Sequence, residues 1–153
     1  MKNNVKRIIS VVAPIVLVAV LGSVFVNLGM DWFNGLTKPS QWIPNWVIPV
    51  VWTVIYVIFA VVLLMWTNKE NLQKSTIALL IINGILNILW CLVFFTLKQT
   101  FLGNIVIILN LIAGIALWVN IFLQKKTYAY WVSIYPIWLS IASTLNLALW
   151  ILN

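Results

Sequence analysis

Charged side chains are scarce in this sequence, which has nine basic and two acidic residues among 153. Hydrophobic residues make up 64% of the chain. A water-soluble protein of this length needs more charge to cover its surface, and its core cannot hold so much apolar side chain. The composition therefore predicts an integral membrane protein whose apolar residues face the lipid bilayer.

Several kinds of catalytic site are disfavoured by what is missing. Histidine, the commonest general base and metal ligand, is absent, and the lone Cys91 has no partner for a disulfide. The two carboxylates, Asp31 and Glu70, are expected on opposite sides of the membrane, so they form no acid–base pair. We therefore expect no metal site and no required cofactor. A hydrolase, a metalloenzyme or an ATPase is disfavoured, and the lack of acidic residues within the spans weakens a proton-coupled transporter.

Long uncharged stretches separate the charged residues, and each of the five has at least 23 residues. A helix of about 20 residues crosses the hydrocarbon core of a bilayer. Runs such as 105–109 are apolar on every side, which disfavours the strands of a membrane barrel. We predict an all-α integral membrane protein, a five-transmembrane-helix bundle in a single domain over 1–153. The expected helices cover about 8–28, 46–67, 75–97, 100–123 and 128–152, with a long loop at 29–45. The first stretch resembles a signal peptide, but its apolar run is too long, so we interpret it as a helix that is not cleaved off.

The basic residues are distributed unevenly between the two sides of this five-helix arrangement. Seven lie on the side of the N-terminus, while only Lys38 and Lys98 lie on the other. Basic residues concentrate on the cytoplasmic side of membrane proteins, so we predict a cytoplasmic N-terminus. This placement accounts for the net charge of +7, and we expect no binding to nucleic acid.

Ten tryptophans are the most unusual feature of the composition. Six of them lie near the ends of predicted spans, as expected for an aromatic belt at the lipid headgroups: Trp32, Trp42, Trp46, Trp66, Trp131 and Trp150. Trp52, Trp90 and Trp138 lie deeper, and Trp118 is ambiguous. A deep indole either packs between helices or lines a flat apolar pocket, and position alone favours packing.

Aromatic and amide side chains form two stripes that we expect to face the interior. In the fifth predicted helix, a 4-3-4-3 spacing places five residues on one face: Trp131, Tyr135, Trp138, Ala142 and Leu145. In the third helix the stripe consists of Asn83, Asn87 and Trp90. Asn87 and Asn146 should point into the bundle, because an unpaired amide is costly in lipid. Each amide alone is interpreted as an interhelical contact, while the two stripes together also fit a pocket for a planar heteroaromatic ligand.

Three groups of residues carry a family resemblance. The stretch Trp32-Phe33-Asn34-Gly35-Leu36-Thr37-Lys38-Pro39-Ser40, then Pro44 and Trp46, then Val51-Trp52 and Tyr56, resembles the signature WY-x-x-L-x-KPSW-x-PP-x-W followed by VW-x-x-x-Y of the TSPO family. Leu86-Asn87-x-x-Trp90 with Phe94-Phe95 is similar to its helix-three motif, and Trp138, Asn146 and Trp150 match its helix five. The chain is identified as a divergent member of this tryptophan-rich sensory protein (TSPO/MBR) family. The departures are Phe33 for Tyr, Gln41 for Trp, Ile43 for the first Pro of a pair, and Ile134 for the Pro before Tyr135.

The resemblance implies a bacterial cell-membrane protein, usually a homodimer, with five helices around a pocket that the first loop caps. It implies porphyrin, heme or another tetrapyrrole as ligand. In some bacterial members it also implies light-dependent porphyrin breakdown, with two implicated tryptophans that align with Trp52 and Trp138, the candidates for a photochemical, catalytic role. The predicted ligand-binding residues are Phe33, Pro44, Trp52, Asn87, Trp90, Tyr135, Trp138, Ala142 and Asn146. The sterol-binding segment of animal members is not expected, because the C-terminal stretch lacks its Tyr and basic residue.

Two functions fit these expectations. In the first, the protein is a membrane binding and sensory module for tetrapyrroles and similar planar hydrophobic ligands. In the second, it is a transporter that moves a porphyrin or another small hydrophobic molecule across the membrane. The same fold serves both functions, because a fold does not determine a function.

Overall fold

The computed structural model describes residues 2–40 and 42–153, so Gln41, one of the family departures, lies outside the described residues. The described residues form α1 (Lys2–Asn34), α2 (Val47–Thr67), α3 (Lys74–Cys91), the π-helix η1 (Leu92–Thr96), α4 (Thr100–Gln124), α5 (Lys126–Val132) and α6 (Ile134–Leu152). Counting α3 with η1 and α5 with α6, five stretches are long and apolar enough to span a membrane. The predicted all-α bundle of five transmembrane helices is confirmed.

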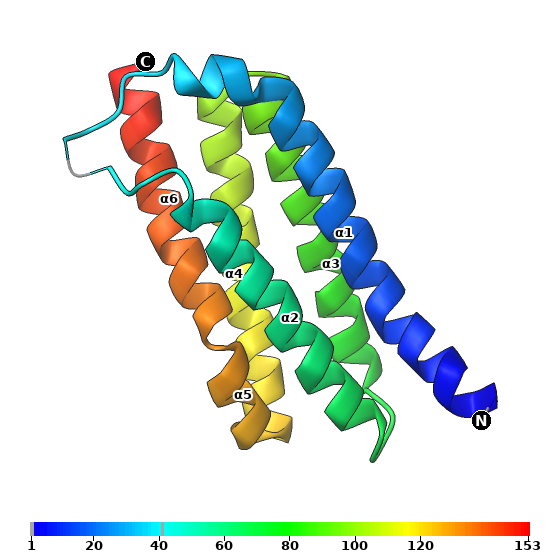
Figure 1. The fold of residues 1–153 in the computed structure, drawn as a ribbon. Helices are drawn as coiled ribbons and strands as arrows, with labels where there is room; N and C mark the ends of the chain where they lie inside the picture. Colours follow the sequence, from blue (N-terminus) through cyan, green and yellow to red (C-terminus); the bar gives the residue numbers. More distant parts are fainter. Residues whose placement is uncertain (1, 41) are drawn as a thin grey trace.

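The five spans lie side by side (Figure 1), and the contacts between them close into a ring. Helix α1 contacts α2 and α3, α3 contacts α4, α4 contacts α5 and α6, and these two contact α2. The order around the ring is therefore α1, α3, α4, α5–α6 and α2. Valine, isoleucine and leucine side chains cover the outer face, which suits contact with lipid, whereas aromatic and amide side chains are concentrated inside.

The two ends of the ring differ in what they carry (Figure 1). One end holds the N-terminus, the link after α2 and the α4–α5 junction, and we call it the cationic end for its basic residues Lys6, Arg7, Lys69, Lys74, Lys125 and Lys126. The other end holds the 35–46 loop, η1 and the C-terminus, and we call it the loop end. The termini thus lie at opposite ends of the bundle, and the cytoplasmic side of the N-terminus stays a prediction.

Helix α1 continues to Asn34, beyond the predicted end at residue 28, so the first loop is shorter than expected. Gly29 makes this extension possible. A Cβ on this residue would lie 2.0 Å from the carbonyl oxygen of Phe95, so α1 and η1 are packed backbone to backbone at this point. The helix ends where the Gly35 N–H bonds to the carbonyl oxygens of Asp31 and Trp32, at 3.3 and 3.1 Å.

The fifth span is interrupted at Ser133, between α5 and α6, whereas the sequence predicted one continuous helix over 128–152. Pro136 has no N–H, and its ring crowds the carbonyl group four residues earlier, so a regular helix is not favoured there. Because of the interruption, residues before and after Ser133 no longer lie on the same face of one helix. Trp131 is 64% exposed while Tyr135 and Trp138 are buried, so the predicted inward stripe is wrong at Trp131.

The belt prediction holds for some tryptophans at span ends and not for others. Trp46, Trp131 and Trp150 are exposed, as a belt requires. Trp66 is 2% exposed and packs against Tyr128 with ring centroids 5.6 Å apart, so its predicted place in the belt is wrong. The reason is the contact between α2 and α5, which covers the last turn of α2.

Candidate ligand pocket at the loop end

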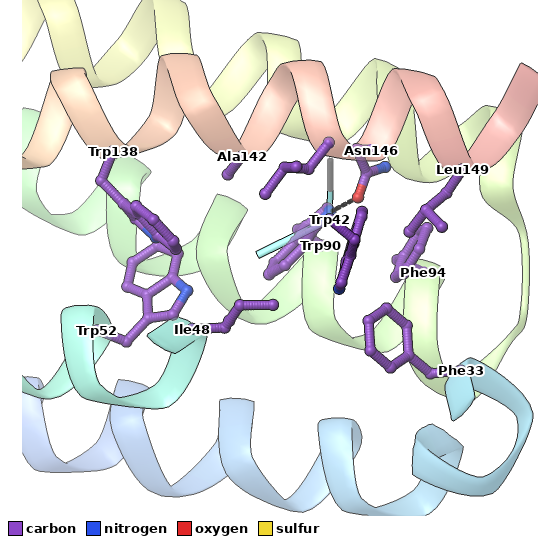
Figure 2. A pocket seen from close by; sticks show the side chains of 11 residues that line it. Phe33, Trp42, Ile48, Trp52, Trp90, Phe94, Trp138, Ala142, Asn146 and Leu149 are labelled. Atoms are coloured by element: carbon purple, nitrogen blue, oxygen red, sulfur yellow. Dashed lines mark hydrogen bonds between the residues drawn. The ribbon is translucent and has the colours of Figure 1, made fainter. Parts of the chain in front are cut away.

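A pocket lies inside the ring at the loop end (Figure 2). Every span except α4 contributes to it, and so does the loop. The lining consists of Phe33, Trp42, Ile48, Trp52, Trp90, Phe94, Trp138, Ala142, Leu145, Asn146 and Leu149. Trp52 on α2 and Trp138 on α6 face the same space from two different helices (Figure 2). The pocket wall is thus almost entirely aromatic and aliphatic.

Six of the nine predicted ligand-binding residues line this pocket: Phe33, Trp52, Trp90, Trp138, Ala142 and Asn146. The other three are placed elsewhere. Asn87 and Tyr135 are buried outside the pocket lining, and Pro44 is exposed in the loop. The binding role of all nine stays a prediction.

Five lining residues were missing from the predicted set. Three of them, Ile48, Phe94 and Leu149, lie four residues along a helix from Trp52, Trp90 and Leu145, respectively. That spacing puts both members of each pair on one face, so it was the signal that could have found them. Leu145 already belonged to the predicted stripe of the fifth helix. Trp42 lies in the irregular loop, where no periodic pattern exists to place it.

Aromatic rings are in contact along one side of the pocket. The series begins at Trp42, whose ring centroid lies 6.1 Å from that of Phe33. Phe33 lies 6.4 Å from Phe94, and Phe94 stacks on Trp90 at 5.9 Å with an interplanar angle of 16°. Trp90 in turn lies 6.5 Å from Trp52. Indole and phenyl faces are therefore present along the whole length of the pocket, which suits a flat ligand.

The loop is held over the pocket by a lysine. The Lys38 ammonium lies 4.7 Å from the centre of the Phe33 ring and donates a hydrogen bond to the Phe33 carbonyl oxygen at 3.0 Å. A cation over an aromatic face is attracted by the ring's negative face. These contacts connect the Lys38-Pro39-Ser40 motif to the end of α1 and so keep the loop close to the lining residue Phe33.

Few polar atoms belong to the lining, and they are indole and amide groups. The Trp90 Nε1–H donates to Asn146 Oδ1 at 3.3 Å (Figure 2). Trp138 Nε1 and Asn146 Nδ2 are buried and have no partner among the described residues. A Cβ on Gly103 would lie 3.4 Å from Asn146 Nδ2, so that amide nitrogen is directed toward α4. Trp138 is therefore a lining residue whose buried N–H is free for an acceptor atom of a ligand.

A polar cluster lies deeper in the bundle than the pocket. The Tyr135 hydroxyl lies 3.0 Å from Asn83 Oδ1 and 3.2 Å from Asn110 Oδ1, and the Asn87 Nδ2 lies 3.5 Å from it. All four side chains are buried, and so is Asn146 in the pocket lining. The predictions that Asn87 and Asn146 face the interior are therefore confirmed. The Tyr135 ring also contacts Trp52 at 6.4 Å. The cluster thus supports one wall of the pocket from below.

The pocket is small. Its volume is about 30 Å³, which is room for about two water molecules. Sites for small molecules usually measure about 300–1,000 Å³. A flat ligand of several rings can therefore enter only if lining side chains move apart. Phe33 and Trp42 lie at or beside the loop, so they are the lining residues that a loop movement would displace first.

The fold and the pocket together define a class: small membrane proteins in which five helices surround an aromatic pocket under the first loop. Within that class, the profile of the TspO/MBR family matches residues 10–151, and the chain belongs to this family. It is 29% identical to the Tryptophan-rich protein TspO of Archaeoglobus fulgidus over 98% of this chain and 99% of that protein. It is 28% identical to Protein CrtK of Rhodobacter capsulatus over 80% and 78% of the two chains. It is 30% identical to the human Translocator protein over 85% and 80%.

Proposed function

We propose that this protein is a membrane binding and sensory protein whose aromatic pocket takes a planar hydrophobic ligand, with tetrapyrroles such as porphyrin or heme as the ligand class. The observation that carries the proposal is the position of Trp52 and Trp138, which line one pocket from α2 and α6. Stacking between two indoles suits a flat ring system, and offset-stacked aromatic pairs contribute about 0.5–1.5 kcal/mol beyond area burial. The free Trp138 N–H adds one orienting donor for a pyrrole nitrogen or a carboxylate.

The names of the relatives support a sensory or a transporting role. One relative, 29% identical over 76% of this chain, is the Tryptophan-rich sensory protein of Cereibacter sphaeroides, whereas the human relative is named Translocator protein. The interior of this chain favours the first role. Tyr135, Asn83 and Asn110 are buried below the pocket and bonded to one another, so a ligand moving from the pocket toward the cationic end would have to break these contacts.

The test is a titration of protoporphyrin against the purified protein in the dark, followed by the change in pigment absorption and in tryptophan fluorescence. Trp52→Phe and Trp138→Phe keep a stacking face but reduce its area, so we expect Kd to rise about three- to tenfold, in line with the size of one aromatic contact. Trp131→Phe is the matched control, because Trp131 is exposed and lies outside the pocket. If all three variants bind protoporphyrin like the wild type, the two indoles have no direct role.

A photochemical role of Trp52 and Trp138 is tested on the same samples. We expect illumination in the presence of dioxygen to bleach bound protoporphyrin, and we expect the bleaching to slow in Trp52→Phe and Trp138→Phe because phenylalanine oxidises less readily than tryptophan. Equal bleaching rates in wild type and both variants at equal occupancy would rule out this role and leave the binding role untouched. For the transporting alternative, the assay is uptake into sealed proteoliposomes, where a binder saturates and a carrier equilibrates the lumen.

A further inference from the structure

A second hollow lies at the cationic end, between the last turn of α2 and the start of α5. It is lined by Met65, Trp66, Lys69, Glu70, Lys125, Thr127 and Tyr128, and we call it the basic groove. Its volume is about 330 Å³, compared with about 30 Å³ for the aromatic pocket. A space of this size accepts a small ligand without rearrangement. None of its lining residues belongs to the predicted tetrapyrrole site.

One wall of the basic groove is apolar. Trp66 is buried, and its ring centroid lies 5.6 Å from that of Tyr128, with the two rings tilted by 40°. Met65 is 52% exposed beside them. These residues belong to the last turn of α2 and the first turn of α5, where the membrane-spanning stretches end. Because Trp66 is 2% exposed, Met65 and the partly exposed Tyr128 present this wall to the region between headgroups and acyl chains.

Three other lining residues are charged. The Lys125 ammonium lies 2.7 Å from the Glu70 carboxylate, and both side chains are more than two-fifths exposed. The hydrogen bond and charge of Lys125 hold the pKa of Glu70 below its ordinary value, so the carboxylate is ionised at neutral pH. Lys69 adds a second cation, so the groove carries two positive charges and one negative charge. Its net charge favours an anion.

The surroundings of the groove strengthen this preference. Arg7 on α1 hydrogen-bonds the Asn68 side chain, which places another cation next to the same link. Lys126, the residue after Lys125 in the sequence, lies over the Phe122 ring at 5.6 Å. Glu70 is the one acidic residue among those at the cationic end of the ring. A basic hollow between membrane helices at the bilayer surface is suited to an anionic headgroup.

We propose that the basic groove binds the phosphate headgroup of an anionic membrane lipid such as phosphatidylglycerol. Lys69 and Lys125 pair with the phosphate, while the glycerol and the first acyl carbons contact Met65 and Tyr128, which the buried Trp66 supports from behind. The apolar wall favours a lipid over a free anion, since a small soluble anion gains nothing from contact with the Tyr128 ring and the Met65 thioether. Lipid phosphate then competes with the Glu70 carboxylate for Lys125.

The experiment is native mass spectrometry of the purified full-length protein, released from micelles that contain equal amounts of dioleoyl phosphatidylglycerol and dioleoyl phosphatidylcholine. We expect preferential retention of phosphatidylglycerol. Lys69→Gln and Lys125→Gln should each reduce that preference about fivefold, because one basic residue near an anionic surface is worth about 1 kcal/mol. Glu70→Gln should increase the preference, since it removes the competing carboxylate from Lys125.

Lys74→Gln is the matched control, because it removes the same charge from the same end without touching the groove lining. A loss of preference in Lys74→Gln as large as in Lys69→Gln would overturn the proposal and assign the effect to overall charge. Equal retention of the two lipids by the wild type would overturn it too. Displacement of phosphatidylglycerol by millimolar inorganic phosphate would assign the site to a free anion instead. Thermal unfolding of each variant checks that it is folded.

Discussion

The two hollows of this protein lie at opposite ends of one ring, and both are lined with tryptophan, yet one is small and the other is about ten times larger. The aromatic pocket leaves about 30 Å³, whereas the basic groove leaves about 330 Å³. The difference follows from the side chains that accompany the indoles. Rings and aliphatic groups at the loop end gain contacts by closing on one another. Lys69, Glu70 and Lys125 would lose hydration if the groove closed around them, so it stays open.

The two proposed ligands differ in the free energy that binding costs them. A ligand of the aromatic pocket has to separate Phe33 and Trp42 from their aromatic partners, so the free energy of those contacts is subtracted from its affinity. A lipid headgroup in the basic groove displaces one exposed carboxylate from one exposed ammonium, which costs little. Affinity at the loop end therefore depends on how firmly the loop end is packed, and the variants below change that packing.

The largest effect is expected at Gly29, where α1 touches η1. Gly29→Ala places a Cβ 2.0 Å from the Phe95 carbonyl oxygen, so α1 and η1 have to separate. Because backbone atoms cannot turn aside as a side chain does, we expect a loss of at least about 2 kcal/mol in the free energy of unfolding, toward the upper part of the usual overpacking range. Denaturation of the purified protein in mixed micelles measures it, and protoporphyrin binding should weaken because Phe94 and Phe95 move with η1.

Gly84→Ala is the control for the change at Gly29, because it adds a methyl group to the same pair of spans. There the new Cβ would lie 3.1 Å from a methyl carbon of Val18, a side chain that can shift by a few tenths of an ångström. We expect Gly84→Ala to change stability by less than about 1 kcal/mol. Equal losses in the two variants would contradict a backbone contact between α1 and η1.

How far the sequence predicts this molecule depends on the kind of signal each part carries. The five spans were predictable because charged residues mark the ends of long apolar stretches. The end of α1 was not predictable, because glycine and aspartate are typical of loops. The helix continues through Gly29 because η1 packs closely against it, and this contact exists only in the folded protein. The break at Ser133 depends on Pro136 one turn later, and periodicity read across it misplaced Trp131.

The aromatic pocket shows the same limit. Trp52 and Trp138 were predicted as pocket residues because the family resemblance aligns them with two implicated tryptophans, whereas their depth within the spans alone favoured packing between helices. Trp42 was predicted at the membrane surface, since its position near a span end is all that the sequence reveals. Its place in the lining depends on the path of an irregular loop, which is determined by contacts with Phe33 and with other parts of the chain. The basic groove was not predicted, because its residues come from two links that meet only in the folded ring.

An intermediate effect is expected at Asn146, which connects α6 to α3. Asn146→Leu removes the acceptor of the Trp90 Nε1–H, so that buried indole keeps no partner among the described residues. Interhelical hydrogen bonds in membranes are worth about 0.6–1.7 kcal/mol, so we expect a loss of about 1 kcal/mol in stability. Asn27→Leu, an exposed position on α1, is the control for the amide-to-leucine change. An Asn146→Leu protein as stable as the wild type would mean that this bond contributes nothing.

The smallest effect is expected at Asn153, whose side chain ties the loop to α6. Its Oδ1 accepts from the Thr37 N–H at 2.9 Å, and its Nδ2 donates to the Thr37 carbonyl oxygen at 3.0 Å and to the Leu149 carbonyl oxygen at 2.8 Å. The amide thus pairs with both backbone groups of one loop residue while it is fixed to the helix. Such exposed bonds contribute about 0.5–1 kcal/mol together, so Asn153→Ala should leave the fold intact and shift the loop toward open conformations.

Because the aromatic pocket admits a ligand only when the loop moves, Asn153→Ala should speed protoporphyrin association about two- to fivefold, which is the population shift that this free energy allows. Lipid retention in the basic groove should not change. Hydrogen exchange provides a readout without ligand, since the amides of Thr37 and Trp42 should exchange faster while those of α4 keep their protection. Thr37→Val is the control, because the bonds from Asn153 go to the backbone of Thr37 and its side chain can be changed without loss. If Asn153→Ala and Thr37→Val exchange and bind alike, the amide of Asn153 does not hold the loop, and its position rests on the aromatic contacts and on the contacts of Lys38 with Phe33.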